Sequence, residues 1–76
     1  MRRAILFTVD DTNGQPLIAE HNLLLSDALC EVKCRRDKGE DAYYAMQKQE
    51  HPHPDAGGCP VCSEILQNIP IAIFAH

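Results

Sequence analysis

Two imidazoles and two thiols fall within one short stretch of the chain, at His51, His53, Cys59 and Cys62. The C-x-x-C step lets both sulfurs face one point from a tight turn, and the glycine pair before it frees the backbone to bend toward that point. The stretch has no apolar content of its own that could order it. A bound metal, with Zn²⁺ as the best match to thiolate and imidazole donors, is therefore the leading explanation for this loop.

A second pair of thiols, Cys30 and Cys34, lies earlier in the chain with a C-x₃-C spacing. Residues four apart share one face of a helix, and they also share one face of a strand, so either structure presents both sulfurs together. Two thiolates from one element and two from a turn can complete a tetrahedron. We therefore predict a four-cysteine zinc site formed by Cys30, Cys34, Cys59 and Cys62.

Two alternatives to that ligand set stay open. In a mixed site His51 and His53 join Cys59 and Cys62, and the earlier cysteines are small buried apolar residues. In the other alternative there is no structural metal, and the cysteines and histidines have no joint role. His21 and His76 lie far from the loop in sequence and are treated as incidental.

Length, charge and cysteine use limit the class of protein. The 76 residues form a single domain, residues 1–76, too small to be comfortably stable without disulfides, a metal or a partner. The net charge of −4 argues against nucleic-acid binding, which needs a basic surface. No apolar run is long enough for a secretory signal or a membrane span, so we expect a soluble cytoplasmic protein. Thiols stay reduced there, which favours metal ligation over disulfides.

The elements that would position these residues begin with a hairpin. Residues 4–9 are rich in β-branched and aromatic side chains, and Asn13-Gly14 follows shortly after them. Asn-Gly is typical of a type I′ hairpin turn, because both residues tolerate positive φ. A second strand over residues 17–24 would then return antiparallel, in a register that the pattern does not define.

A central helix is predicted from Ser26, a good N-cap residue. Leu25, Leu29 and Val32 share one face, and Tyr43 and Met46 continue the spacing, so the helix either kinks or breaks near Gly39 and restarts at Glu40. Alternation over residues 28–36 leaves a strand as the competing interpretation. The helical segment ends near Glu50, because the prolines of His51-Pro52-His53-Pro54 cannot continue it.

In the last part of the chain we predict one or two helical turns over residues 63–68, which Pro70 ends. A short strand over residues 71–74 is then predicted to join the hairpin as a third strand. The predicted fold is a small α+β domain. It consists of an N-terminal β-hairpin, a central helix that carries Cys30 and Cys34, a zinc-binding loop and a C-terminal strand.

These features favour a non-enzymatic, zinc-stabilised module that binds another protein. No phosphate loop, nucleophile elbow or carboxylate pair is present in the sequence. The apolar terminal strand could pair with a partner or with a second copy of the chain as a homodimer. The alternative is a thiol redox or metal-handling protein, because Cys59-Pro60-Val61-Cys62 matches the C-P-x-C pattern of glutaredoxin-like redox sites. That resemblance covers four residues, and a thioredoxin-like domain needs several more strands and helices after the motif.

Overall fold

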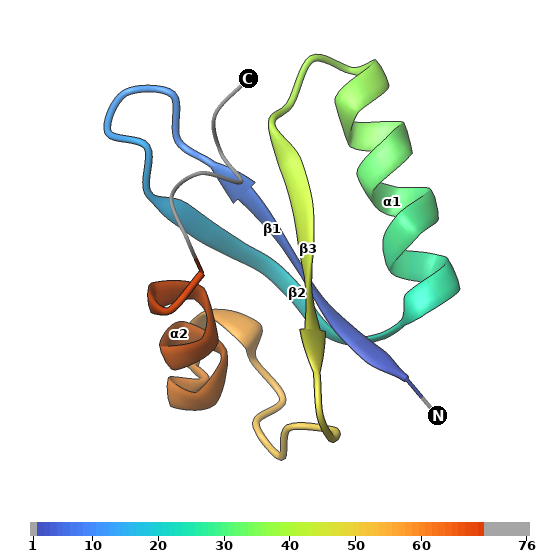
Figure 1. The fold of residues 1–76 in the computed structure, drawn as a ribbon, viewed down its shortest axis with the longest axis vertical. Helices are drawn as coiled ribbons and strands as arrows, with labels where there is room; N and C mark the ends of the chain where they lie inside the picture. The colour runs from blue at the N-terminus through green and yellow to red at the C-terminus, as the bar shows by residue number, and fades with distance from the viewer. Residues whose placement is uncertain (1, 70–76) are drawn as a thin grey trace.

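The computed structural model describes residues 2–69, which form a three-stranded antiparallel sheet with two α-helices (Figure 1). In chain order the elements are β1 (Arg3–Val9), β2 (Pro16–Leu24), α1 (Leu25–Asp37), β3 (Ala42–Gln47), the short 3₁₀ helix η1 (Ala56–Gly58) and α2 (Pro60–Gln67). The predicted small α+β fold is confirmed. The strand predicted over residues 71–74 lies outside the described residues.

Strands β1 and β2 form the predicted N-terminal hairpin. Their ladder ends where Val9 pairs with Pro16, so residues 10–15 make up the connecting loop. Gly14 adopts a φ of +69°, whereas Asn13 is not in the left-handed region. The turn is therefore longer than the two-residue type I′ turn that Asn-Gly suggested.

Helix α1 confirms the helix predicted from Ser26, and the competing strand over residues 28–36 is not formed. Arg35 and Arg36 lie in its last turn, where basic side chains complement the helix dipole. Gly39 follows at a φ of +91°, a conformation that favours glycine and ends the helix.

The prediction that the chain returns to helix after Gly39 is wrong. Residues 42–47 form strand β3, which pairs antiparallel with β1 so that Tyr44 lies opposite Leu6. Adjacent tyrosines fit a pleated, half-buried surface well. The free edge of β1 supplies the hydrogen-bond partners, and the resulting strand order β2-β1-β3 makes β1 the central strand.

One face of β1 packs against the C-terminal part of the described chain. Ile5 and Phe7 are both 0% exposed and belong to a cluster with Leu66 of α2 and with the two cysteines of the C-x-x-C motif. Cys59 and Cys62 therefore lie in the apolar core on this side of the sheet.

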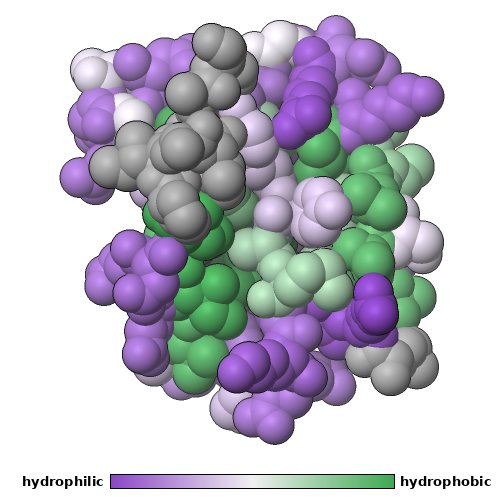
Figure 2. All heavy atoms as spheres, viewed as in Figure 1, coloured by the Kyte–Doolittle hydropathy of each residue, from purple (hydrophilic) through white to green (hydrophobic). Residues whose placement is uncertain are grey.

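Helix α1 covers the opposite face, so that the two helices lie on opposite sides of the strands (Figure 1). Ala4 and Leu6 of β1 are buried on this face, and the buried residues of α1 are Ala28 and Val32. Leu29, which was predicted to share one apolar face with Leu25 and Val32, is 47% exposed. Figure 2 shows apolar side chains at the surface over both helices. Within residues 2–69 neither helix has the length and apolar character needed to cross a bilayer.

Candidate metal centre

Four side chains that can ligate a metal converge beside the sheet: His21, His51, Cys59 and Cys62. One donor atom from each lies within 4.8 Å of the donor atoms of the other three. His21 comes from β2, His51 from the loop after β3, and the two cysteines from the start of α2. Two imidazoles and two thiols in this arrangement could hold a metal ion.

The distances between the donor atoms resemble the edges of a coordination tetrahedron. Cys62 Sγ lies 3.0 Å from His51 Nδ1 and 3.2 Å from His21 Nδ1. Cys59 Sγ lies 3.8 Å from His51 Nδ1. With metal–sulfur bonds near 2.3 Å and metal–nitrogen bonds of 2.0–2.1 Å, the edges of a regular tetrahedron measure about 3.3 to 3.8 Å. Small side-chain adjustments would therefore suffice to bind an ion.

The two sulfurs are placed by η1 and by the first turn of α2. The Asp55 carboxylate accepts a hydrogen bond from the Gly57 N–H at 3.0 Å and caps η1. Pro60 opens α2 at a position where its missing N–H is tolerated. Cys59 precedes the helix and Cys62 lies in its first turn, and both are 0% exposed. The paired glycines before the motif do not adopt positive φ, so the backbone freedom expected of them is not used.

Only one of the two histidines in the proline-rich segment enters the cluster. His51 is 5% exposed, and His53 is exposed. The chain bends at Pro52 and again at Pro54, so the segment does not present both imidazoles on one side as an extended chain would. Asn22 of β2 also holds the His51 backbone, since the His51 N–H donates to Asn22 Oδ1 at 2.8 Å.

The structure does not bring Cys30 and Cys34 to Cys59 and Cys62. The two earlier cysteines are exposed free thiols on α1, on the face of the sheet opposite α2 (Figure 1). The four-cysteine arrangement is thus not formed within the described part of the chain. The later cysteine pair is joined instead by His51, one of the alternative ligands, and by His21.

His21 is the member of the cluster that the sequence analysis did not identify as a ligand. Its distance along the chain suggested an incidental residue, yet its ring centroid lies 6.0 Å from that of His51. The β1–β2 pairing brings it to the same side of the sheet as the cysteines. The one hint in the sequence is an imidazole in the middle of a mainly apolar strand.

Burial and neighbouring groups shift the pKa values of three side chains in the cluster. Burial, and then the charge of His21, hold the pKa of His51 below its ordinary value. Burial acts to raise the pKa of Cys59, but hydrogen bonds from Cys62 and from the Val61 backbone outweigh it and lower that pKa. Burial, and then the hydrogen bond and charge of Cys59, raise the pKa of Cys62 to about 12. His51 is thereby held in the neutral form that binds metals, and a metal would have to displace the Cys62 proton.

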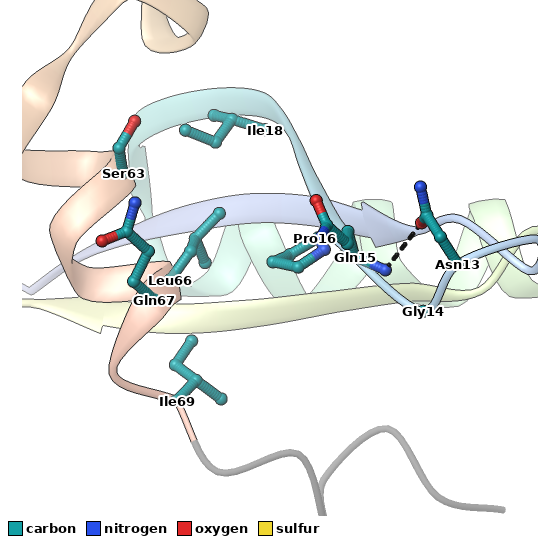
Figure 3. A pocket seen from close by; sticks show the side chains of 9 residues that line it. All are labelled: Asn13, Gly14, Gln15, Pro16, Ile18, Ser63, Leu66, Gln67 and Ile69. Atoms are coloured by element: carbon teal, nitrogen blue, oxygen red, sulfur yellow. Dashed lines mark hydrogen bonds between the residues drawn. The ribbon is translucent and has the colours of Figure 1, made fainter.

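A separate pocket of about 510 Å³ lies between the hairpin loop and α2 (Figure 3). Ile18 and Leu66 form much of its apolar wall, with Ile69 below them. The described residues that line it carry no titratable side chain. Among the described residues, the lining of this pocket therefore offers no group for acid–base chemistry, in contrast to the cluster of His21, His51, Cys59 and Cys62.

Comparison of the chain with protein-family models, with curated proteins and with solved structures finds no match, so its function is inferred from the site itself.

Proposed function

We propose that His21, His51, Cys59 and Cys62 bind one Zn²⁺ and that the ion holds the C-terminal part of the domain onto the sheet. The observation that carries this proposal is the convergence of four donor atoms within 4.8 Å from three separate places in the chain. Side chains brought together from a strand, a loop and a helix start make a cross-link when they share one ion.

Zinc is the ion that suits these donors. Two sulfurs and two nitrogens at tetrahedral spacing are a common ligand set for Zn²⁺, whereas Ca²⁺ and Mg²⁺ require oxygen ligands. Charge balance supports a divalent ion, because two thiolates neutralise its charge while both imidazoles stay neutral. The buried site would then carry no net charge, and the cost of desolvating an uncompensated charge is avoided.

A structural role is better supported than a catalytic one. Four protein ligands complete the tetrahedron and leave no open position for water or substrate, which a catalytic zinc keeps. Helix α2 has only 8 residues, and helices shorter than about 12 residues are marginal unless tertiary contacts hold them. An ion bound at its first turn supplies such a contact, so we propose a non-enzymatic module.

The burial of the C-x-x-C motif argues against the competing function, which is thiol redox chemistry. Reactive cysteines are partly exposed, because the attacking sulfur must reach a partner, and Cys59 and Cys62 are both 0% exposed. The two functions differ in alkylation of the native protein. Zinc-bound thiolates should stay blocked until a chelator is added, whereas redox thiols should react at once, and Cys30 and Cys34 should react in either case.

We also propose that the module acts by binding another protein. A groove of about 520 Å³ adjoins the metal cluster, with His51 in its wall. Met46 and Val61 line it and are 43% and 41% exposed, and Ile65 adds a third apolar side chain. A second copy of the chain is the partner that can be tested directly, whether it pairs through this groove or through residues 70–76.

Sedimentation velocity over a wide concentration range tests that association. Val61→Lys places a charge in the groove, and Leu29→Lys makes the same change at an exposed leucine on α1. If this groove is the contact, Val61→Lys should weaken dimerisation at least tenfold and Leu29→Lys should leave it unchanged. A wild-type protein that stays monomeric at the highest concentration would exclude the homodimer.

The zinc proposal is tested by elemental analysis of the purified protein together with Co²⁺ titration. We expect one zinc per chain and, after replacement by Co²⁺, the visible and near-ultraviolet bands of a tetrahedral ion with two thiolate ligands. Cys62→Ser should abolish both, and Cys34→Ser, which changes an exposed thiol in the same way, should alter neither. A folded protein that contains no metal and gives no Co²⁺ bands would refute the proposal.

A further inference from the structure

Strand β2 contains a bulge at the point where it contributes to the metal cluster. Ala4 of β1 pairs with Leu23 and Leu6 pairs with Glu20, so both His21 and Asn22 lie opposite the single residue between them, Ile5. Consecutive side chains of a regular strand point to opposite faces. Here the extra residue changes that alternation, which is how a bulge can redirect a side chain.

Asn22 adopts the left-handed conformation at this bulge, with a φ of +59°. It is the only non-glycine residue with positive φ in residues 2–69. Asparagine tolerates this region better than other residues with a side chain, because its short polar group can hydrogen-bond locally. The backbone is therefore set for asparagine or glycine at this position.

The Asn22 carboxamide holds the His51 backbone with two hydrogen bonds. Its Nδ2 donates to the His51 carbonyl at 2.9 Å, and its Oδ1 accepts from the His51 N–H at 2.8 Å. This pair of bonds reproduces the pairing that a neighbouring strand would give. His51 follows Glu50 in a segment without regular secondary structure, so these bonds fix its position relative to β2.

Gln47 fixes the orientation of the Asn22 carboxamide in turn. Its Nε2 donates to Asn22 Oδ1 at 3.0 Å, and its Oε1 accepts from the Asn22 N–H at 2.8 Å. Gln47 is the last residue of β3 and is 5% exposed. Arg3 donates to the Asn22 carbonyl at 3.1 Å, so each polar group of Asn22 has a partner.

We infer that Asn22 is the positioning residue of the proposed zinc site, an inference that rests on the function proposed above. The bulge that it forms lets two consecutive residues of β2 serve the same site: His21 reaches Cys62, and Asn22 holds His51. Its role needs both the left-handed backbone and a side chain with one donor and one acceptor. Glycine supplies only the backbone, and aspartate supplies the acceptor without the donor.

This role predicts graded effects on metal binding. Asn22→Gly keeps the bulge and removes both bonds to His51, so the affinity for Co²⁺ and Zn²⁺ should fall by about 10- to 100-fold, the range found when partners of metal ligands are removed. Asn22→Asp retains the bond from the His51 N–H and should give a smaller loss. Asn13→Gly makes the same change in the exposed hairpin loop and should leave the affinity unchanged.

The experiment measures Co²⁺ affinity, the Co²⁺ absorption spectrum and the rate of zinc release to a chelator, at a temperature where circular dichroism shows each variant folded. A change in the Co²⁺ bands of Asn22→Gly would show that a ligand is misplaced, which a general loss of stability would not produce. If Asn22→Gly does not fold, Asn22→Asp decides by the same readouts. Wild-type affinity and spectrum in the decisive variant would overturn the positioning role and leave the zinc site standing. A wild-type protein that binds no Co²⁺ would overturn both.

Discussion

Removal of the proposed zinc ion is the perturbation with the largest expected effect on this domain. Structural zinc in small metal-dependent modules contributes about 10–16 kcal/mol of apparent binding free energy at neutral pH. At about 0.05–0.15 kcal/mol per residue, a chain of 76 residues has a total stability of only about 4 to 11 kcal/mol. The binding free energy available to the proposed site is therefore as large as the whole stability expected of a domain of this length.

The structure indicates which part of the domain would depend on the proposed ion. Strands β1 and β2 share the hairpin ladder, and β3 pairs with β1, so the sheet and α1 have contacts that do not pass through the cluster. Residues 48–69 contain only a 3₁₀ turn and the 8-residue helix α2, and Leu66 is the one fully apolar side chain of α2 that is buried. We expect this segment to be the first to unfold when the metal-free protein is heated.

The size of the effect can be estimated from linkage. Free zinc at a thousand times its dissociation constant stabilises the folded state by about 4.1 kcal/mol. For a domain of this length 1 kcal/mol shifts Tm by about 4–8 °C, so chelation should lower Tm by at least about 16 °C.

Thermal melting followed by circular dichroism, with and without a strong chelator, measures the shift, and a chelator already saturated with zinc is the control. Hydrogen exchange read by mass spectrometry should show loss of protection in residues 51–67 before β1. An unchanged Tm after verified removal of the metal would refute this reasoning. Uniform loss of protection across the domain would refute the assignment of the dependent segment.

Three further outcomes are expected. His51→Ala should abolish stoichiometric zinc binding, and His53→Ala should not, because only His51 is buried in the cluster; elemental analysis of the two variants compares them. In the metal-free protein the pKa of His51 lies below its ordinary value of 6.5, so the unfolded state binds this proton more tightly, and denaturant titrations should show stability that is present above pH 6.5 and decreases as the pH falls below it. Leu66→Ala should cost about 2–5 kcal/mol in the same titrations, whereas Leu17→Ala, at a residue that is 55% exposed, should change stability by no more than about 0.5 kcal/mol.

The local elements of this fold were predictable because their signals are local. Residues 4–9 and 17–24 form the predicted hairpin, although its turn is longer than two residues, and Ser26 lies within one residue of the observed helix start. The helical turns predicted over residues 63–68 belong to α2, which begins earlier, at Pro60. The closeness of the C-x-x-C motif to His51 was predictable for the same reason. Few residues separate them, and the mixed-site alternative already grouped His51 with these cysteines, although it included His53 as well.

Strand β3 was not predictable in this way because its stabilisation is non-local. Tyr43 and Met46 fit a helical spacing as well as a strand, so the pattern alone does not decide between them. The choice is made by the free edge of β1, where Ala42 to Gln47 find backbone partners that lie more than thirty residues earlier in the chain. The pairing of β3 with β1 also places α1 and α2 on opposite faces of the sheet. This separation explains why Cys30 and Cys34 do not meet Cys59 and Cys62.

The position of His21 depends on a feature still harder to read from sequence, the bulge in β2. A shift of one residue in strand register exchanges the two faces of a sheet. Regular pairing would place His21 and Asn22 on opposite faces, and only one of them could contribute to the cluster. The bulge requires positive φ, which Asn22 provides, and the carboxamide that makes this conformation acceptable also binds His51. The conformation of Asn22 thus links the inclusion of His21 in the proposed site to the placement of His51. Substitution of Asn22 should therefore disrupt the proposed site without altering any of its ligands.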